Sequence, residues 1–369
     1  MFYSSFRIGR PPRKRANALK DAGDISIEYP QHMTPKKSWC PLPWLSMSIR
    51  NNGDLRVCCH ANMSQARGIL HDENNVRLNA ATVDLQQARN VPLMNDIRKA
   101  MLRDELHEAW VRGNREDASK IRSRRTYERQ NWEKVLDFDK SMAMTNPDGS
   151  LELTEAPLQF VDVRFGNKCN LKCRMCCPTD SDFWYREHYE TMAKGFQDTG
   201  CRVALKQLEN GRVVVAGEVP FQWYNSSSFS DQIKSGVFDK LERLHCVGGE
   251  PLINHKHFEL LEVLVERGRS SHVELEYNTN LTILPEKILE LWPRFKAVSV
   301  GVSMDAIGSR NDYIRFPSKF AVIEKNLRRL DELTFNLTYR IATTVMIYNI
   351  FHLPEIIRWR FQTVLRHVN

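Results

Sequence analysis

Short apolar runs alternate with segments of helical period through the second half of the sequence. Five runs predict strands over residues 158–165, 241–247, 272–277, 297–303 and 336–346. Helices are predicted between and after them, at 182–194, 229–238, 257–267, 285–291, 320–333 and 353–364. Because strands and helices alternate repeatedly, we expect parallel βα units with right-handed crossovers. The strands read as near-continuous apolar runs, which predicts that both faces of the sheet are covered.

These elements predict an α/β protein built on a partial TIM-type (βα) barrel of five to six parallel strands. A doubly wound sheet is the alternative, but no G-x-G-x-x-G turn follows the first strand. A polar cluster follows each predicted strand, and the carboxyl ends of barrel strands share one rim. We therefore expect a single site built from residues 169–176, 248–250, 278–280, 303–305 and 343–348.

The first half of the chain is more polar and less regular. We predict that residues 1–37 are a disordered basic leader and that residues 38–150 form a small α+β module. In that module, two alternating stretches flank Asn52-Gly53, which predicts a β-hairpin, and a charged helical segment follows. A second hairpin is predicted within residues 203–219, around Asn210-Gly211, as an insertion that could cover the site. Residues 151–369 form the predicted barrel.

Composition narrows the class of protein. The 369 residues contain no apolar run near the ~20 residues that span a bilayer, and the first residues lack the apolar core of a secretory signal. We therefore expect a cytoplasmic protein without a membrane partner, in which nine cysteines favour metal binding over disulfides. A net charge of +8 is compatible with nucleic acid as a partner, but we interpret the basic segment 120–129 first as a solvated helix face.

Three cysteines, Cys169, Cys173 and Cys176, stand in a C-x3-C-x2-C spacing directly after the first predicted strand. Thiolates are soft ligands, and a loop lets three sulfurs converge, so the triplet favours an iron–sulfur cluster. Three ligands leave one iron of a four-iron cluster open to another molecule. A zinc site is the alternative, although zinc knuckles usually take four ligands in two pairs.

The C-x3-C-x2-C triplet resembles the signature of the radical SAM enzymes, in which the open iron chelates S-adenosylmethionine. The hairpin with Cys40, Cys58 and Cys59 resembles the start of the twitch and SPASM modules found in such proteins from bacteria and phages. The resemblance implies a [4Fe-4S] cluster on Cys169, Cys173 and Cys176, and an electron donor such as flavodoxin or ferredoxin. The family barrel usually has six strands, so either the chain stops before the sixth or another segment, such as the leader, supplies it.

The resemblance also assigns the S-adenosylmethionine site. Gly248-Gly249-Glu250 resembles the family's GGE motif, in which two glycines let the backbone approach the ligand and oxygens accept from its ammonium group. Ser303 and Asp305 match the S-x-D that closes the fourth strand. The full predicted set of cofactor-binding residues is Met175, Gly248, Gly249, Glu250, Asn278, Ser303, Asp305 and Arg340.

An auxiliary cluster is less well supported by the sequence. In the resembling group the segment after Ala109 commonly reads A-C-x-x-C, and here Trp110 and Gly113 stand at the two cysteine positions. Neither residue can ligate iron, so we hypothesise that the second cluster is lost. The alternative is a second [4Fe-4S] cluster on Cys40, Cys58 and Cys59, with a distant cysteine such as Cys201 or Cys246.

The implied function is reductive cleavage of S-adenosylmethionine to a 5′-deoxyadenosyl radical that takes a hydrogen atom from a substrate. The cofactor carries the difficult chemistry and the protein orients the reactants, so no acid–base pair is expected. By analogy with twitch and SPASM relatives, the first candidate substrate is a peptide or protein side chain. The alternatives are a catalytically silent scaffold that binds the cluster, and an RNA-associated protein.

Overall fold

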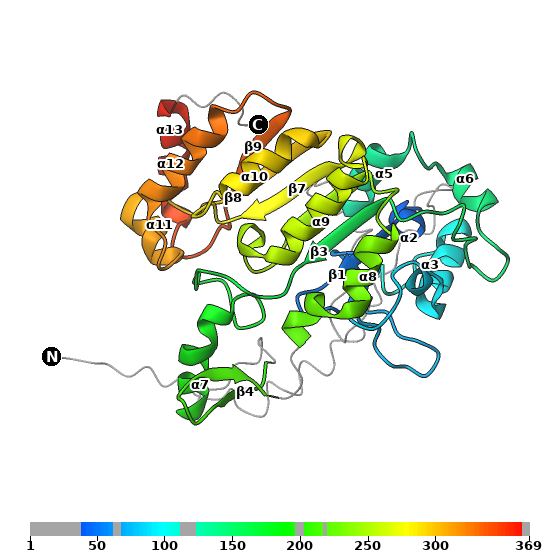
Figure 1. Ribbon diagram of the computed structural model, residues 1–369, viewed down its shortest axis with the longest axis horizontal. Helices are drawn as coiled ribbons and strands as arrows, with labels where there is room; N and C mark the ends of the chain where they lie inside the picture. The colour runs from blue at the N-terminus through cyan, green and yellow to red at the C-terminus, as the bar shows by residue number, and fades with distance from the viewer. Residues whose placement is uncertain (1–37, 62–67, 111–122, 196–202, 217–219, 364–369) are drawn as a thin grey trace, which may run out of the picture.

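A computed structural model describes residues 38–61, 68–110, 123–195, 203–216 and 220–363. The predicted leader, Gly113 and Cys201 lie outside these residues. Seven strands form one sheet in the order β2-β1-β3-β6-β7-β8-β9 (Figure 1). Their bounds are β1 Ser46–Ile49, β2 Leu55–Arg56, β3 Phe160–Arg164, β6 Arg243–Val247, β7 Glu274–Thr279, β8 Ala297–Ser303 and β9 Leu337–Ala342. All neighbours except β1 and β2 pair in parallel, and β2 and β9 end the sheet, so the barrel is open over the described residues.

Four helices cover one face of this sheet: α8 Ser227–Ser235, α9 His255–Glu266, α10 Glu286–Leu291 and α12 Phe320–Asp331. They lie in chain order, as α8 to α10 show in Figure 1, and ion pairs join α9 to α10 and α10 to α12. Each of α9, α10 and α12 links two adjacent parallel strands, as a crossover helix does. Helices on a single face are what a barrel requires, so the predicted partial barrel is confirmed in its architecture.

The opposite face of the sheet is polar, and the prediction of strands covered on both faces is wrong. In β7 the buried Leu275 and Tyr277 alternate with the part-exposed Glu276 and Asn278. Successive side chains of a strand point to opposite faces, so the apolar set packs against the helices. The register aligns a polar row on the other face, one residue from each parallel strand: Ser48, Asp162, His245, Glu276, Ser299 and Thr338.

The N-terminal module contributes one further parallel strand to the sheet. Strand β1 pairs in parallel with β3 over four residues, from Ser46 opposite Phe160 to Ile49 opposite Val163. This strand joins the sheet beside β3, at the edge opposite β9, where a strand that follows the last predicted one would pair. The sheet therefore crosses the predicted boundary near residue 150.

Buried arginines fix the rest of this module against β1. Arg89 donates to the carbonyl of Trp44, and Arg98 donates to the carbonyls of Pro43, at 3.1 Å, and Gly149, at 2.6 Å. Both side chains are fully buried, and burial lowers the pKa of Arg89 to about 10 and of Arg98 to about 9. The helices of the module are α2 Leu42–Leu45, α3 Pro92–Leu102, α5 Arg124–Trp132 and α6 Phe138–Ala143.

Helix α5 corrects the interpretation of the basic segment 120–129 as a solvated face. The described part of that segment buries Arg125 and Glu128, and Glu128 lies within ion-pair distance of Arg124, at 2.5 Å, and Arg243, at 3.4 Å. Arg243 also lies over the Trp132 ring, 5.3 Å from its centroid. These contacts attach α5 to β6, beside the polar face of the sheet.

The remaining elements surround the carboxyl end of the sheet. Helix α7 Tyr185–Ala193 follows the cysteine loop, and the inserted hairpin forms strands β4 Leu205–Gln207 and β5 Val213–Val215. Helix α11 Gly308–Ile314, which the sequence analysis did not predict, follows β8, and α13 Leu353–Gln362 follows β9. The described residues include no helix that is both long and apolar enough to cross a membrane.

Candidate cofactor site

The polar face of the sheet and the strand ends open into a cavity of about 980 Å³. Ligand pockets commonly measure about 300–1,000 Å³, so the space accommodates a large small-molecule ligand. Its lining includes every predicted cluster or cofactor residue except Asp305: Cys169, Cys173, Met175, Cys176, Gly248, Gly249, Glu250, Asn278, Ser303 and Arg340. Residues predicted from separate strands therefore meet in one place.

The loop that carries the three cysteines is held by hydrogen bonds to the segments around it. The Cys169 amide donates to Asp182, at 3.1 Å, and the Trp184 indole donates to the Cys173 carbonyl, at 3.1 Å. On the other side, the amide of Glu250 donates to the carbonyl of Lys168, at 2.9 Å. Since the segment Asp182–Trp184 and the turn after β6 both hold the loop, the fold fixes the positions of the sulfurs.

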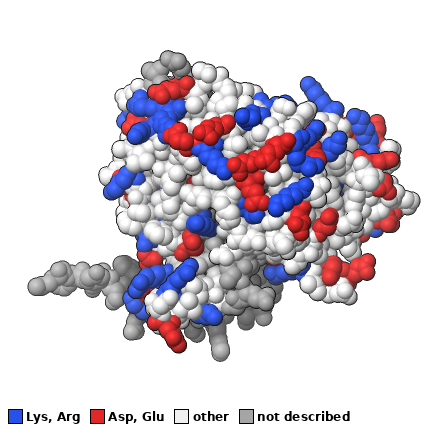
Figure 2. Space-filling model, in the orientation of Figure 1, with Lys and Arg blue, Asp and Glu red and all other residues white. Residues whose placement is uncertain are grey.

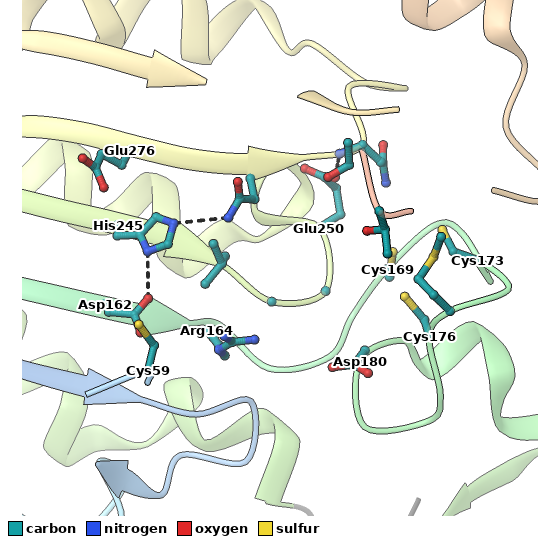
Figure 3. Close-up of a pocket in the computed structure, with 18 of the residues that line it drawn as sticks. Cys59, Asp162, Arg164, Cys169, Cys173, Cys176, Asp180, His245, Glu250 and Glu276 are labelled. Carbon is teal, nitrogen blue, oxygen red and sulfur yellow. Dashed lines mark hydrogen bonds and ion pairs between the residues drawn. The ribbon is translucent and has the colours of Figure 1, made fainter. Parts of the chain in front are cut away.

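The three thiols face a common space, at the end of the cavity where the parallel strands finish (Figure 3). A hydrogen bond between Cys173 and Cys176 lowers the pKa of Cys173 and raises that of Cys176. Burial raises the pKa of Cys169 to about 12. The Arg315 guanidinium lies 3.8 Å from the Cys173 sulfur, where its charge favours the thiolate that a metal requires.

Gly248 and Gly249, here called the glycine cradle, occupy two positions at which any side chain would clash with neighbouring atoms. Their φ angles are +80° and +53°, in the region that favours glycine. A Cβ on Gly248 would lie 2.5 Å from the Cβ of Arg164, and one on Gly249 would lie 2.3 Å from the carbonyl oxygen of Lys168. The lack of side chains therefore lets this turn pack directly against Arg164 and the cysteine loop, and the expected close approach to a ligand stays a prediction.

The Glu250 carboxylate is buried and anchored. It accepts hydrogen bonds from the Leu252 amide at 3.0 Å, the Thr279 hydroxyl at 2.7 Å and the Asn280 amide at 2.7 Å. Burial raises its pKa, against the opposing effect of these donors. The side chain thus links β6 to the end of β7 and presents a fixed acceptor to the cavity.

Asp305 differs from the other predicted residues because it is fully buried and does not line the cavity. Its carboxylate lies 2.8 Å from the Arg315 guanidinium and accepts from the Thr344 amide at 2.8 Å. Arg315 in turn contacts Cys173 and lines the cavity. In this structure Asp305 acts on the site through Arg315.

A close contact between a histidine and a buried carboxylate at the inner end of the cavity was missed from the sequence, where no acid–base pair was expected. His245 lies 2.9 Å from Asp162, and the Ser48 hydroxyl donates to the same carboxylate at 2.8 Å (Figure 3). Burial alone would raise the pKa of Asp162, but His245, Arg164 and Ser48 together lower it. The only signal in the sequence is a charged or polar residue in the middle of each strand.

The three cysteines of the N-terminal hairpin lie together behind this inner end. Cys40 and Cys58 are buried, and Cys59 lines the cavity beside Asp162 (Figure 3). Burial raises the pKa of Cys40 to about 12, and the hydrogen bond with Cys58 lowers the pKa of Cys59. Trp110, at one of the positions where the resembling group has cysteine, is fully buried.

The inserted hairpin does not line the main cavity. Strand β5 instead lines a separate cavity of about 450 Å³, together with Asn167, Lys168 and Asp182 on the far side of the cysteine loop. The predicted role of the hairpin in covering the site therefore remains a prediction.

The donors present fit an iron–sulfur cluster and a ligand beside it. Within the described residues, no three His, Cys, Asp or Glu side chains are arranged to hold a single metal ion. Each thiolate of a four-iron cluster binds a different iron, so a cluster needs wider spacing than a single ion. Three thiols around one space, next to a glycine turn that packs closely against the cysteine loop, provide such an arrangement.

Comparison with solved structures returned several similar chains. They include anSMEcpe with bound AdoMet, at 15% identity and a TM-score of 0.37, where 57% of this chain matches 51% of that chain. SuiB from Streptococcus suis bound to S-adenosylmethionine shows 12% identity and a TM-score of 0.33, over 78% of this chain and 57% of that chain. SuiB bound to its precursor peptide SuiA shows 13% identity and a TM-score of 0.31, over 76% and 56%. The chain thus spans about half the length of these structures.

No curated protein matches the sequence. The family model of the radical SAM superfamily matches residues 163–359, which is more than half of the chain and includes the three cysteines and all five strands of the predicted barrel apart from the first residues of β3. This chain is therefore a member of the radical SAM superfamily.

Proposed function

We propose that this radical SAM enzyme cleaves S-adenosylmethionine reductively and uses the product radical on a peptide or protein side chain. When bound, the cluster supplies one electron to S-adenosylmethionine, which yields methionine and a 5′-deoxyadenosyl radical that takes a hydrogen atom from the substrate. The single observation that carries the proposal is the meeting of the cysteine loop and the Gly248–Glu250 turn in one cavity. The residues that would hold the cluster are Cys169, Cys173 and Cys176.

The chain's own residues would orient the reactants. Glu250, held by three hydrogen bonds, would accept a hydrogen bond from the ammonium group of S-adenosylmethionine. The two glycines would let the protein backbone come close to the same ligand. Asn278, Ser303 and Arg340 line the same cavity and would contact its other polar groups. The polar inner end, with His245 and Asp162, would face the substrate.

The test is an anaerobic assay of full-length protein with dithionite and S-adenosylmethionine. Release of 5′-deoxyadenosine is expected from the native chain and from Cys177→Ala, which alters a neighbouring thiol outside the cavity lining. It is expected to disappear in Cys173→Ala. A silent protein that binds the cluster would release none in any variant, and intact turnover in Cys173→Ala would refute the assignment.

We also propose that the auxiliary cluster is lost. Support comes from Trp110, which fills one expected cysteine position with a buried ring that cannot ligate iron. Anaerobically reconstituted protein should then contain about four iron atoms per chain, the content of one [4Fe-4S] cluster. A content near twice that value would show that a second cluster is present.

The choice of a peptide substrate rests on analogy with twitch and SPASM relatives, which the hairpin resembles; its described strands β1 and β2 form one edge of the sheet. We propose that a flavodoxin or ferredoxin supplies the electron, and that the enzyme works in the cytoplasm, where its cysteines stay reduced. On the face shown in Figure 2, basic and acidic side chains are interspersed, and we do not propose a nucleic-acid partner.

A further inference from the structure

Most charged side chains that line the cavity have a counter-ion within the described chain. Arg124 pairs with Glu128, Arg315 with Asp305, His245 with Asp162, and Glu276 with Arg243. Two cavity guanidinium groups, those of Arg164 and Arg340, make no ion pair and no side-chain hydrogen bond with the described residues. These two cations are therefore available to a ligand.

Arg164 occupies the middle of the cavity. It is the last residue of β3, and its side chain lies between the inner end, at Asp162, and the cysteine loop, at Cys176 and Asp180 (Figure 3). Its stem packs against the Gly248 turn, since a Cβ added to Gly248 would lie 2.5 Å from the Arg164 Cβ. A group bound by Arg164 would thus lie beside the proposed S-adenosylmethionine position and face the inner end.

The surroundings of Arg164 contain charges of both signs, because the nearby Asp162 carboxylate is among the groups whose pKa it lowers. The charge of Arg164 lowers the pKa of Arg50 and of Arg56, although burial is the larger cause for both. Arg56 is used by backbone carbonyls of the hairpin, among them that of Cys59, at 3.4 Å. A partly buried guanidinium near other cations, with no ion pair to a carboxylate, favours an anionic ligand.

We propose that Arg164 binds a carboxylate of the substrate and so determines substrate specificity. This inference rests on the proposed function, in which the substrate is a peptide. S-adenosylmethionine has a single carboxylate, and the resemblance assigns Arg340 to the cofactor, so Arg164 is left for the second molecule. A guanidinium fork matches a carboxylate in two parallel hydrogen bonds.

The acidic residues near Arg164 favour a singly charged anion as its ligand over a doubly charged one. Asp162, Asp180 and Glu250 line the same cavity, and a doubly charged phosphate would be repelled more strongly by them than a carboxylate. In a peptide the carboxylate has two sources, an acidic side chain or the chain terminus. Both present the same chemistry to Arg164, and the experiment separates them.

The experiment measures peptide binding calorimetrically to the anaerobically reconstituted full chain with S-adenosylmethionine but without reductant. The probes are acetyl-Ala-Glu-Ala-amide with its Gln analogue, and acetyl-Ala-Ala-Ala with a free or an amidated terminus. In the native chain one of the two acids should bind about tenfold more tightly than its amide, the scale of one charge-assisted pair. The pair that shows the difference identifies the source of the carboxylate.

In Arg164→Gln the preference should fall below twofold, while the affinity for S-adenosylmethionine stays within twofold of the native value. Arg164→Lys, which keeps the charge but not the fork, should retain part of the preference and serves if the Gln variant does not fold. Arg340→Gln is the matched control, and it should weaken S-adenosylmethionine binding but keep the preference. Equal binding of acid and amide by the native chain, or a preference that survives in Arg164→Gln, would overturn the inference.

A third result would also overturn it. If Arg164→Gln loses S-adenosylmethionine rather than the peptide preference, Arg164 binds the cofactor. Failure of the proposed function is seen separately, as an absence of 5′-deoxyadenosine in the reductive assay, because peptide binding is measured without turnover.

Discussion

The buried pair of Asp305 and Arg315 should dominate the local stability of the site. The two groups lie 2.8 Å apart with 0% and 9% of their side chains exposed, so little solvent screens them. At about 4 Å and the effective dielectric of ~20 used for proteins, two unit charges interact by about 4 kcal/mol. Asp305→Asn keeps an acceptor for the Thr344 amide, at 2.8 Å in the native chain, and removes only the charge.

Removal of one partner leaves the other charge buried without compensation, which typically costs about 3–5 kcal/mol. We therefore expect Asp305→Asn and Arg315→Gln each to lower the free energy of unfolding by about 3 kcal/mol. In the double variant, the loss of unfolding free energy should be about 2 kcal/mol smaller than the two single losses added together, since the second change removes the charge that the first left without a partner. The measurement is urea unfolding at pH 7, followed by circular dichroism under anaerobic conditions.

The matched control is the pair of Glu324 and Arg328 on α12. Its groups are also close, 2.9 Å apart, but 29% and 56% of their side chains are exposed. Exposed pairs one helical turn apart contribute about 0.3–0.5 kcal/mol. If the coupling energy of Asp305 and Arg315 were no larger than that of the control pair, burial would not be the source of the strength of the interaction.

Two further outcomes are expected. Gly248→Ala should weaken S-adenosylmethionine binding by at least about tenfold, the effect of losing one strong contact, because its Cβ would overlap Arg164. The control is Gly268→Ala, at φ +66° with no atom within 4 Å, which should leave S-adenosylmethionine binding unchanged. If calorimetry gave the same affinity for Gly248→Ala as for the native chain, the proposed role of the cradle would be contradicted. Asp162→Asn should have a lower free energy of unfolding than the native chain at neutral pH. The difference between the two should become smaller as the pH falls below about 4. The reason is that the folded-state pKa of Asp162 lies below the unfolded value of about 3.9, so its contribution is present above that value and lost on acidification. Urea unfolding between pH 3 and pH 7 gives the gap, and a constant gap would refute the assignment.

The elements whose signal is local were predicted well from the sequence. Strand β8 has the predicted bounds, and α9, α12 and α13 begin within two residues of the prediction or at it. The cysteine loop, the Gly248–Glu250 turn and Ser303 were placed correctly at one rim, because the carboxyl ends of parallel strands meet there whatever the loops between them do.

What the sequence could not show depends on contacts between distant residues. Strand β1 is four residues long and pairs with a strand more than a hundred residues later, so its membership of the sheet has no local signal. The contact of His245 with Asp162 depends on the register of β3 and β6, and a shift of one residue would turn both side chains toward the helices. The burial of Asp305 against Arg315 could not be predicted for a similar reason, since Arg315 lies at the end of a helix that was not predicted.

The polar row across the sheet explains why a barrel of this kind has a site along its inner face as well as at its rim. A charged or hydroxyl side chain at each of six adjacent strands cannot form a dry core, because buried polar groups need partners. Ser48 donates to Asp162, and His245 lies 2.9 Å from the same carboxylate, whereas Glu276 and Ser299 lie on the cavity wall. The inner face is thus built to contact a polar ligand, and the cavity extends from the cysteine loop along the strands toward α5. A substrate that enters this space would meet the reactive end of the cofactor at one end and the ion pairs of the sheet at the other.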